Sequence, residues 1–260
     1  MTNSAFFKNS IEDSIAFVAI DRPPVNVLGF SHFEMLCQNI LEFVERKDIR
    51  AIILSGNDKA FVSGFDIREI ASMKNPDQVK QTTTRIKHLM TKMETANKPI
   101  IAAIKGSCLG GGFELVLACH LRIAADEAKL GLPEIKLATI PTFGGTVRLP
   151  KIIGRARALE MILTGKIISG EEAFRIGLVN KVCKGEELLS MAKSLAHSIS
   201  EKGVFAVEAA IKSIIAANEI DTEQAMKLES ELSGCLVETK DLKDNIAAFF
   251  EKRKAVSLRS

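Results

Sequence analysis

The sequence predicts an α/β fold for most of its 260 residues, followed by a purely helical segment. Short apolar runs of strand length alternate with longer segments of helical period through roughly the first 190 residues. Two of these runs, residues 51–56 and 100–106, end in a glycine and lead into a loop and a helix. From Ile168 onward the pattern is helical. We therefore divide the chain into a core, residues 1–195, and a helical region, residues 196–260.

Each strand prediction depends on length, apolar content and a stop signal. Residues 14–23 alternate apolar and other side chains until Pro23, which is typical of a strand that enters a loop. The other predicted strands are short and apolar, and they lie at residues 49–56, 98–106, 120–125, 128–134 and 178–183.

The helix predictions depend on apolar residues spaced three and four apart. Residues 31–47 show this spacing, with Ser31 as the expected N-cap. Residues 57–73 turn through Gly64 into a short helix. The remaining predicted helices lie at residues 77–96, 109–119, 169–177, 185–200, 203–219, 221–237 and 239–255. Residues 206–217 carry more apolar surface than one buried face can hide, which indicates a subunit interface.

Composition excludes several classes of protein. A net charge of +3 is too small to indicate nucleic-acid binding, and the chain has neither tyrosine nor tryptophan for base stacking or for tyrosine-based hydride chemistry. No segment reads as a signal peptide or a membrane span. Five scattered cysteines without a CxxC pair suggest reduced thiols that pack in the core, and therefore a cytoplasmic protein. Four dispersed histidines offer no metal-ligand spacing.

The stretch "SCLGGGFELVLACHLRIAADEAKLGLPE", residues 107–134, combines three glycines with two glutamates. Glycine lets a backbone approach a ligand closely, and the first turn of a helix has free N–H groups. Glu114 follows Gly111 by three residues and so lies near the same helix face. An oxyanion site beside a carboxylate suits proton transfer next to a carbonyl that becomes an enolate. Glu134 could pair with Glu114 as acid and base.

Structural explanations stay open at this point. The glycines could serve close packing of a helix on a strand, with Glu114 in solvent. Glu134 could be a surface residue after proline. The spacing fits neither of the usual phosphate-binding glycine loops.

The segment "AAIKGSCLGGGFELVLAC…RIAADEAKLGLPEIKLATIPTFGGTVRLPKIIG" closely resembles the enoyl-CoA hydratase/isomerase, or crotonase, superfamily. The resemblance also covers "IDRPPVNVLGFSHFEML", "AIILSGNDKAFVSGFDIREI" and "FFEKRKA", which is essentially the whole chain. It implies a crotonase-like spiral of repeated ββα units with a C-terminal helical trimerisation region, assembled as a homotrimer or a dimer of trimers.

The resemblance also implies roles for individual residues. The backbone N–H groups of Phe65 and Gly111 would hold the thioester carbonyl as it becomes an enolate. Glu114 and Glu134 match the two glutamates of the hydratase subset, which add water across the C2=C3 bond of a 2-enoyl-CoA. Three further residues would bind the CoA part of the substrate: Arg68, Phe249 and Lys252. An acyl-CoA thioester is then the substrate, and neither a metal nor a cofactor is implied, since CoA belongs to the substrate.

Some positions depart from the common hydratase pattern. Thr142 and Phe143, in the water and acyl pocket, stand where small residues are typical, and Phe65 replaces a frequent alanine. These side chains put chain-length preference in doubt but leave the backbone N–H groups available. His120 replaces a frequent aspartate, which we interpret as a structural variation.

Other functions remain as alternatives. A Δ3,Δ2-enoyl-CoA isomerase, or another acyl-CoA lyase or hydrolase on the same scaffold, would need proton transfer at the enolate without net addition of water. A non-enzymatic or RNA-binding relative is the remote alternative, because one fold can host several functions. The basic stripe and stacking aromatics that RNA binding needs are missing from the sequence. Lys252 and its neighbours could equally form a solvated basic tail.

Overall fold

The computed structural model describes residues 6–73 and 75–251. Its strands are β1 (Phe7–Glu12), β2 (Ile15–Ile20), β3 (Val27–Leu28), β4 (Ala51–Ser55), β5 (Ala60–Val62), β6 (Gly64–Phe65), β7 (Ile100–Ile104), β8 (Ser107–Leu109), β9 (Leu121–Ala125), β10 (Lys129–Gly131), β11 (Ile167–Ser169) and β12 (Lys181–Cys183). Its helices are α1 (Phe30–Glu45), α2 (Ile67–Ser72), α3 (Pro76–Glu94), α4 (Gly111–Leu117), the 3₁₀ helix η1 (Pro133–Leu137), α5 (Gly145–Ile153), α6 (Arg155–Thr164), α7 (Gly170–Arg175), α8 (Leu188–Ser200), α9 (Val204–Ala216), α10 (Thr222–Leu236) and α11 (Lys240–Phe250).

The strands form one large sheet and two small ones. The large sheet has the order β1-β2-β4-β7-β9-β12, and all its pairs are parallel except β1 with β2. A second sheet has the order β11-β10-β8-β5, and β3 pairs with β6. The chain thus repeats one unit: a strand in the large sheet, a short strand in another sheet, then a helix. This repetition confirms the predicted α/β spiral of ββα units.

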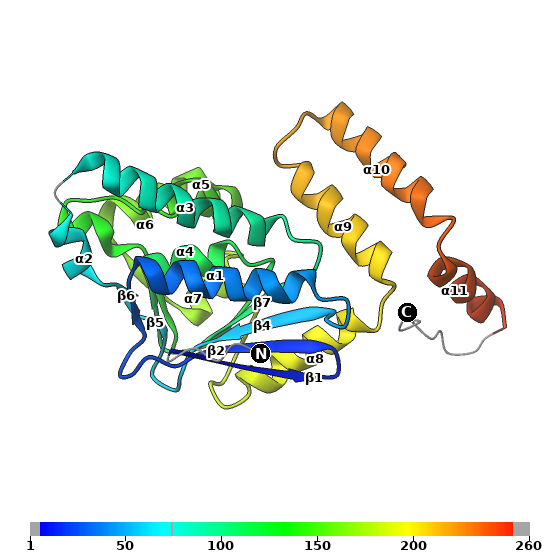
Figure 1. Cartoon of the computed structure of the whole chain (residues 1–260), viewed down its shortest axis with the longest axis horizontal. Helices are drawn as coiled ribbons and strands as arrows, with labels where there is room; N and C mark the ends of the chain where they lie inside the picture. The colour runs from blue at the N-terminus through cyan, green and yellow to red at the C-terminus, as the bar shows by residue number, and fades with distance from the viewer. Residues whose placement is uncertain (1–5, 74, 252–260) are drawn as a thin grey trace.

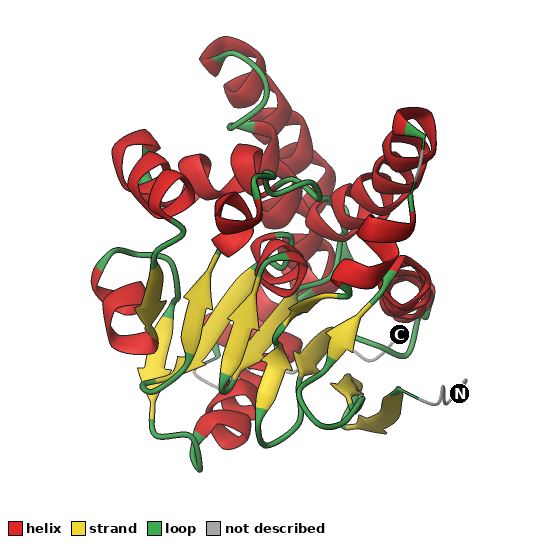
Figure 2. Cartoon of the chain, turned by 90° about the vertical axis from the view of Figure 1, so that its left-hand side faces the viewer, coloured by secondary structure: helices red, strands yellow, loops and turns green. Residues whose placement is uncertain are grey.

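The two faces of the large sheet bury different partners, because successive side chains of a strand point to opposite faces. Val18, Ile52 and Ala102 face the core beneath α1 and α4. Ile53 and Ala103, one residue further along their strands, face α8. The strands lie side by side in Figure 2, and Figure 1 shows α1 and α8 on opposite sides of them.

The start of α1 differs from the prediction. Ser31 was expected to be the N-cap, but the helix begins at Phe30 and Gly29 is the N-cap, so this expectation is wrong. The reason is a tertiary contact, since the carboxylate of Glu69 in α2 accepts a hydrogen bond from the N–H of Phe30 at 2.8 Å. A Cβ on residue 29 would lie 1.8 Å from that carboxylate, so a larger residue there would displace the Glu69 side chain from this position. The sequence interpretation also did not include β1, α5 or α6.

The C-terminal helices fall into two groups. Helix α8 packs on the sheet through Leu188, Ala192 and Ala196. Helices α9, α10 and α11 extend from the body as a separate layer (Figure 1). The proposed boundary after residue 195 lies within α8. Among the helices of residues 6–73 and 75–251, none is long and apolar enough to cross a membrane.

Candidate active site

The glycine-rich turn lies between β8 and α4, and its backbone geometry requires glycine. Gly110 has φ +54° and ψ −128°, a backbone conformation that other residues rarely adopt. A Cβ on Gly112 would lie 2.5 Å from the Cβ of Val62 and 2.7 Å from its carbonyl oxygen, so only glycine lets α4 approach β5 this closely. The structural and the catalytic explanations of the glycines are therefore compatible.

Glu114 lies in the first turn of α4 and is only 2% exposed. Its Oε1 accepts hydrogen bonds from the N–H groups of Phe143, at 2.7 Å, and Gly145, at 2.8 Å. Burial raises the pKa of Glu114 from 4.5 to about 7; these N–H groups and that of Thr142 oppose the rise, and the charge of Glu134 adds to it. Glu114 is therefore no solvated surface residue.

Glu134 is the second residue of the 3₁₀ helix η1, at the other side of the glycine turn. A Cβ on Gly110 would lie 3.1 Å from Oε1 of Glu134, so this carboxyl group lies directly over the turn. Its Oε2 is buried and has no hydrogen-bond partner within residues 6–73 and 75–251. Burial raises the pKa of Glu134 from 4.5 to about 7 as well. Two carboxyl groups that both titrate near neutral pH thus flank one glycine turn.

Backbone N–H groups of two segments lie beside these carboxyl groups. Gly111 is the first residue of α4, where N–H groups lack a partner within the helix. Phe65 pairs with Leu28 across β3 and β6, and the N–H of Asp66, the next residue, donates to the carbonyl of Leu28. Because alternate residues of a parallel strand bond to a given neighbour, the N–H of Phe65 points away from β3. Helix α4 packs against β6, which brings Phe65 close to the glycine turn.

A buried arginine that the sequence interpretation missed supports the loop around Glu114. Arg148 is 7% exposed and donates from Nη1 to the carbonyl of Phe143 at 2.9 Å. Its Nε donates to Glu94 at 2.7 Å, and its Nη2 donates to Thr91 at 3.1 Å. Arg148 thus ties the loop that holds Glu114 to helix α3. The motif "GGTVRLP" contains the residue, but only the fold reveals its partners.

Of the predicted CoA-binding residues, Arg68 and Phe249 can be placed, and they lie in different parts of the fold. Arg68 lies on α2, just after Phe65, with an 83% exposed side chain that forms a two-point ion pair with Asp66. Phe249 is 79% exposed on α11, at the far end of the molecule from α2 and β6 (Figure 1). Lys252 lies outside the described residues.

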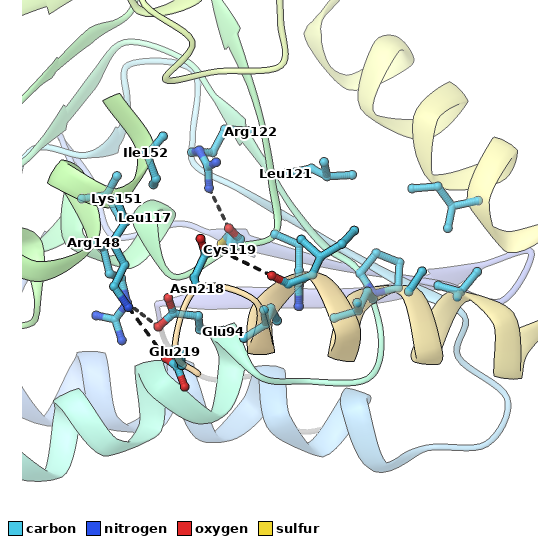
Figure 3. A pocket seen from close by; sticks show the side chains of 18 residues that line it. Glu94, Leu117, Cys119, Leu121, Arg122, Arg148, Lys151, Ile152, Asn218 and Glu219 are labelled. Carbon is cyan, nitrogen blue, oxygen red and sulfur yellow. Dashed lines mark hydrogen bonds and ion pairs between the residues drawn. The ribbon is translucent and has the colours of Figure 1, made fainter. Parts of the chain in front are cut away.

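A separate cavity of about 450 Å³ lies between α9 and the body of the protein. Figure 3 shows Arg148, Glu94 and Glu219 gathered at one end of it. Neither Glu114 nor Glu134 lines this cavity, so it is distinct from the candidate site. His120 also lines it and accepts a hydrogen bond from the N–H of Ile100 at 3.0 Å. Burial lowers the pKa of His120 to about 4, which agrees with a structural role.

Known proteins resemble this chain over nearly its full length. The family model described as enoyl-CoA hydratase/isomerase matches residues 10–257. A probable enoyl-CoA hydratase of Bacillus subtilis (strain 168) is 40% identical over 246 residues, which are 94% of this chain and 95% of the relative. A crotonyl-CoA hydratase of Syntrophomonas wolfei is 37% identical over 248 residues, 94% of each chain.

The fold also resembles solved structures. The crystal structure of an enoyl-CoA hydratase from Bacillus anthracis matches with a TM-score of 0.91 and 37% sequence identity, over 98% of this chain and 99% of that one. Together, the spiral fold, the glycine turn with its two glutamates and these matches show that the chain belongs to the enoyl-CoA hydratase/isomerase family.

Proposed function

We propose that the protein is an enoyl-CoA hydratase, which adds water across the C2=C3 bond of a 2-enoyl-CoA thioester. The observation that carries this proposal is a pair of carboxyl groups on either side of one glycine turn: Glu114, which is buried, and Glu134, whose Oε2 is buried. Both have a pKa of about 7, so near neutral pH the pair holds about one proton. One member can then accept a proton from water while the other supplies a proton to carbon.

The backbone N–H groups of Phe65 and Gly111 would stabilise the negative charge that develops on the thioester oxygen. Support comes from the free first turn of α4 and from the direction of the Phe65 N–H. Because these groups belong to the backbone, they are fixed before substrate arrives. A single oxyanion-hole donor is typically worth about 3 kcal/mol of activation barrier.

The names of the relatives agree with hydration, since two of them are called enoyl-CoA or crotonyl-CoA hydratases. An isomerase would need only one carboxyl group to move a proton. The second carboxyl group, that of Glu134, whose pKa burial raises to about 7, would then have no role in the reaction. The pair therefore favours hydration.

The test is an assay with crotonyl-CoA, which loses ultraviolet absorbance when its conjugated double bond is hydrated. Mass detection should show the gain of one water. Glu114→Gln and Glu134→Gln should each lower kcat by about 10²–10⁴-fold, because each removes a group that transfers a proton. Glu42→Gln, at an exposed position of α1, is the matched control and should keep full activity. Full activity in both active-site variants would refute the mechanism. Conversion of a 3-enoyl-CoA without hydration would instead favour the isomerase.

We propose further that the protein acts as a trimer or a dimer of trimers. The support is the family resemblance and the exposed apolar side chains of the C-terminal helices: Phe205, Ile214, Met226, Val237, Ile246, Phe249 and Phe250. In such an assembly Phe249 and Lys252 would reach CoA on a neighbouring subunit, while Arg68 would face CoA on its own. Light scattering should give the mass of three or six chains, and a monomer mass would refute this part.

Two proposals concern the surroundings of the reaction. The two glutamates can supply the proton transfers, so CoA as part of the substrate is the only cofactor-like group that the reaction needs. Cys37, Cys108 and Cys119 are buried free thiols, which supports a reducing, cytoplasmic location.

A further inference from the structure

Four phenyl rings meet beside the candidate site and form what we call the phenylalanine cluster: Phe30, Phe33, Phe65 and Phe143. Their centroids lie 4.4 Å apart for Phe30 and Phe65, and 5.3 Å apart for Phe33 and Phe143. Phe65 lies 5.9 Å from Phe143 and 6.1 Å from Phe33. The rings come from the start of α1, from β6 and from the loop before α5. Such spacings are those of aromatic rings in direct contact.

The cluster borders the backbone groups to which the chemistry is assigned. A Cβ on Gly111 would lie 3.0 Å from the ring of Phe33 and 3.1 Å from that of Phe143. Phe65 carries one of the two proposed oxyanion N–H groups, and the N–H of Phe143 donates to Glu114. A substrate with its carbonyl oxygen at Gly111 and its double bond at Glu114 would therefore lie next to these rings.

Packing and backbone contacts hold the residues of the phenylalanine cluster in place, so the cluster forms a rigid surface. Phe33 is fully buried and Phe143 is 2% exposed, which fixes the inner pair in the core. Phe30 and Phe65 are only partly exposed. The carboxylate of Glu69 binds the N–H of Phe30 at 2.8 Å. The pairing of β3 with β6 fixes the backbone on either side of Phe65. These contacts fix the backbone of both outer residues, and their two rings pack against each other with centroids 4.4 Å apart.

We propose that the phenylalanine cluster closes the acyl end of the site and restricts the enzyme to short 2-enoyl-CoA esters, with crotonyl-CoA preferred. This inference rests on the proposed hydratase function. Each carbon beyond the crotonyl methyl group meets a ring that is already packed against other rings. A close-packed interior resists extra methylene groups, because the side chains around them have no free volume into which they can move.

The test compares kcat/KM for crotonyl-, hexenoyl-, octenoyl- and decenoyl-CoA, all as trans-2-enoyl esters. We expect kcat/KM to fall by about tenfold or more from crotonyl- to decenoyl-CoA, as for an acyl chain too long for its pocket. Phe65→Ala and Phe30→Ala should each raise the ratio of decenoyl to crotonyl activity by about tenfold. Phe174→Ala, at a half-exposed phenylalanine of α7, is the matched control and should leave the ratio unchanged.

The possible results separate the two proposals. If the unmodified protein hydrates all four esters with similar efficiency, the proposal that the phenylalanine cluster restricts chain length is refuted, but the hydratase proposal is supported. An unchanged ratio in both Phe65→Ala and Phe30→Ala would do the same. If the protein hydrates none of the esters, both the hydratase proposal and the chain-length proposal are refuted. If Phe65→Ala does not fold, Phe65→Leu removes the planar ring with less loss of volume, and the profile of the unmodified protein still decides.

Discussion

Replacing Glu114 by glutamine should stabilise the folded protein at alkaline pH while it removes activity. The carboxylate of Glu114 is charged above neutral pH, yet it is buried, and its pKa is raised from 4.5 to about 7. Folding therefore costs free energy whenever this group must be charged. Glutamine has nearly the same shape, and its carbonyl oxygen can accept the same N–H groups of Phe143 and Gly145, but it carries no charge.

The sign and size follow from the pKa. Below pH 4.5 the folded and unfolded chains both hold the proton, so Glu114 carries no charge cost. Between 4.5 and 7 only the folded chain holds it, and stability falls as pH rises. Above pH 7 the full cost applies. A rise from 4.5 to about 7, at 1.36 kcal/mol per pKa unit, gives about 3 kcal/mol.

The assay is urea unfolding of Glu114→Gln and the unmodified protein at pH 5 and pH 8.5, at one protein concentration. The variant's advantage in free energy of unfolding should increase by about 2.5 kcal/mol between the two pH values, because part of the cost is already present at pH 5, where the unfolded chain has mostly lost this proton. Effects of the substitution that do not depend on pH cancel in this comparison. Glu42→Gln should show little change at either pH, because its side chain is in water in both states. An equal difference at both pH values would refute the argument that Glu114 is a buried, costly charge.

Three further predictions concern the support of the site. Arg148→Met leaves the carbonyl of Phe143 and the carboxylate of Glu94 without their guanidinium, and it should lower the free energy of unfolding by about 3 kcal/mol in urea titrations; an unchanged midpoint would contradict the assigned role. Gly112→Ala should destabilise by about 3 kcal/mol through its clash with Val62, whereas Gly234→Ala, in open space on α10, should stabilise by up to about 1 kcal/mol; equal effects would refute the close-approach argument. Dialysis against a chelator should leave hydration of crotonyl-CoA unchanged, and activity restored only by added metal would show that the two carboxyl groups are insufficient.

The sequence predicted the fold class because its signals are local. Short apolar runs specify the strands of the large sheet except β1, and most helices except α5 and α6 show clear apolar spacing. The failures are contacts between distant segments. Ser31 was expected to cap α1, but Glu69, 39 residues from Phe30, binds the first N–H of that helix instead.

The candidate site shows the same division. Gly110 and Glu114 can be recognised from one short motif, since backbone and carboxyl group belong to one turn of helix. A role for Glu134 could be predicted only from the family resemblance. The burial that raises its pKa depends on the fold and has no signal in the neighbouring sequence. The ion pair of Arg148 with Glu94 spans 54 residues and has no local signal. Phe65 and Phe143 could be noted as bulky, but their contact with Phe33 required the folded chain.

The donors that bind Glu114 lie about 30 residues further along the chain, in the segment from Phe143 to Gly145. During synthesis, Glu114 therefore leaves the ribosome before the groups that satisfy it, and helix α4 cannot bury this carboxylate favourably until α5 docks. The same dependence holds in the mature protein, where opening of α5 would release both Arg148 and Glu114. In native-state hydrogen exchange, the amides of Phe143 and Gly145, which both donate to Glu114, should therefore exchange as one cooperative unit, and a molecule able to bind substrate is one in which α5 is docked.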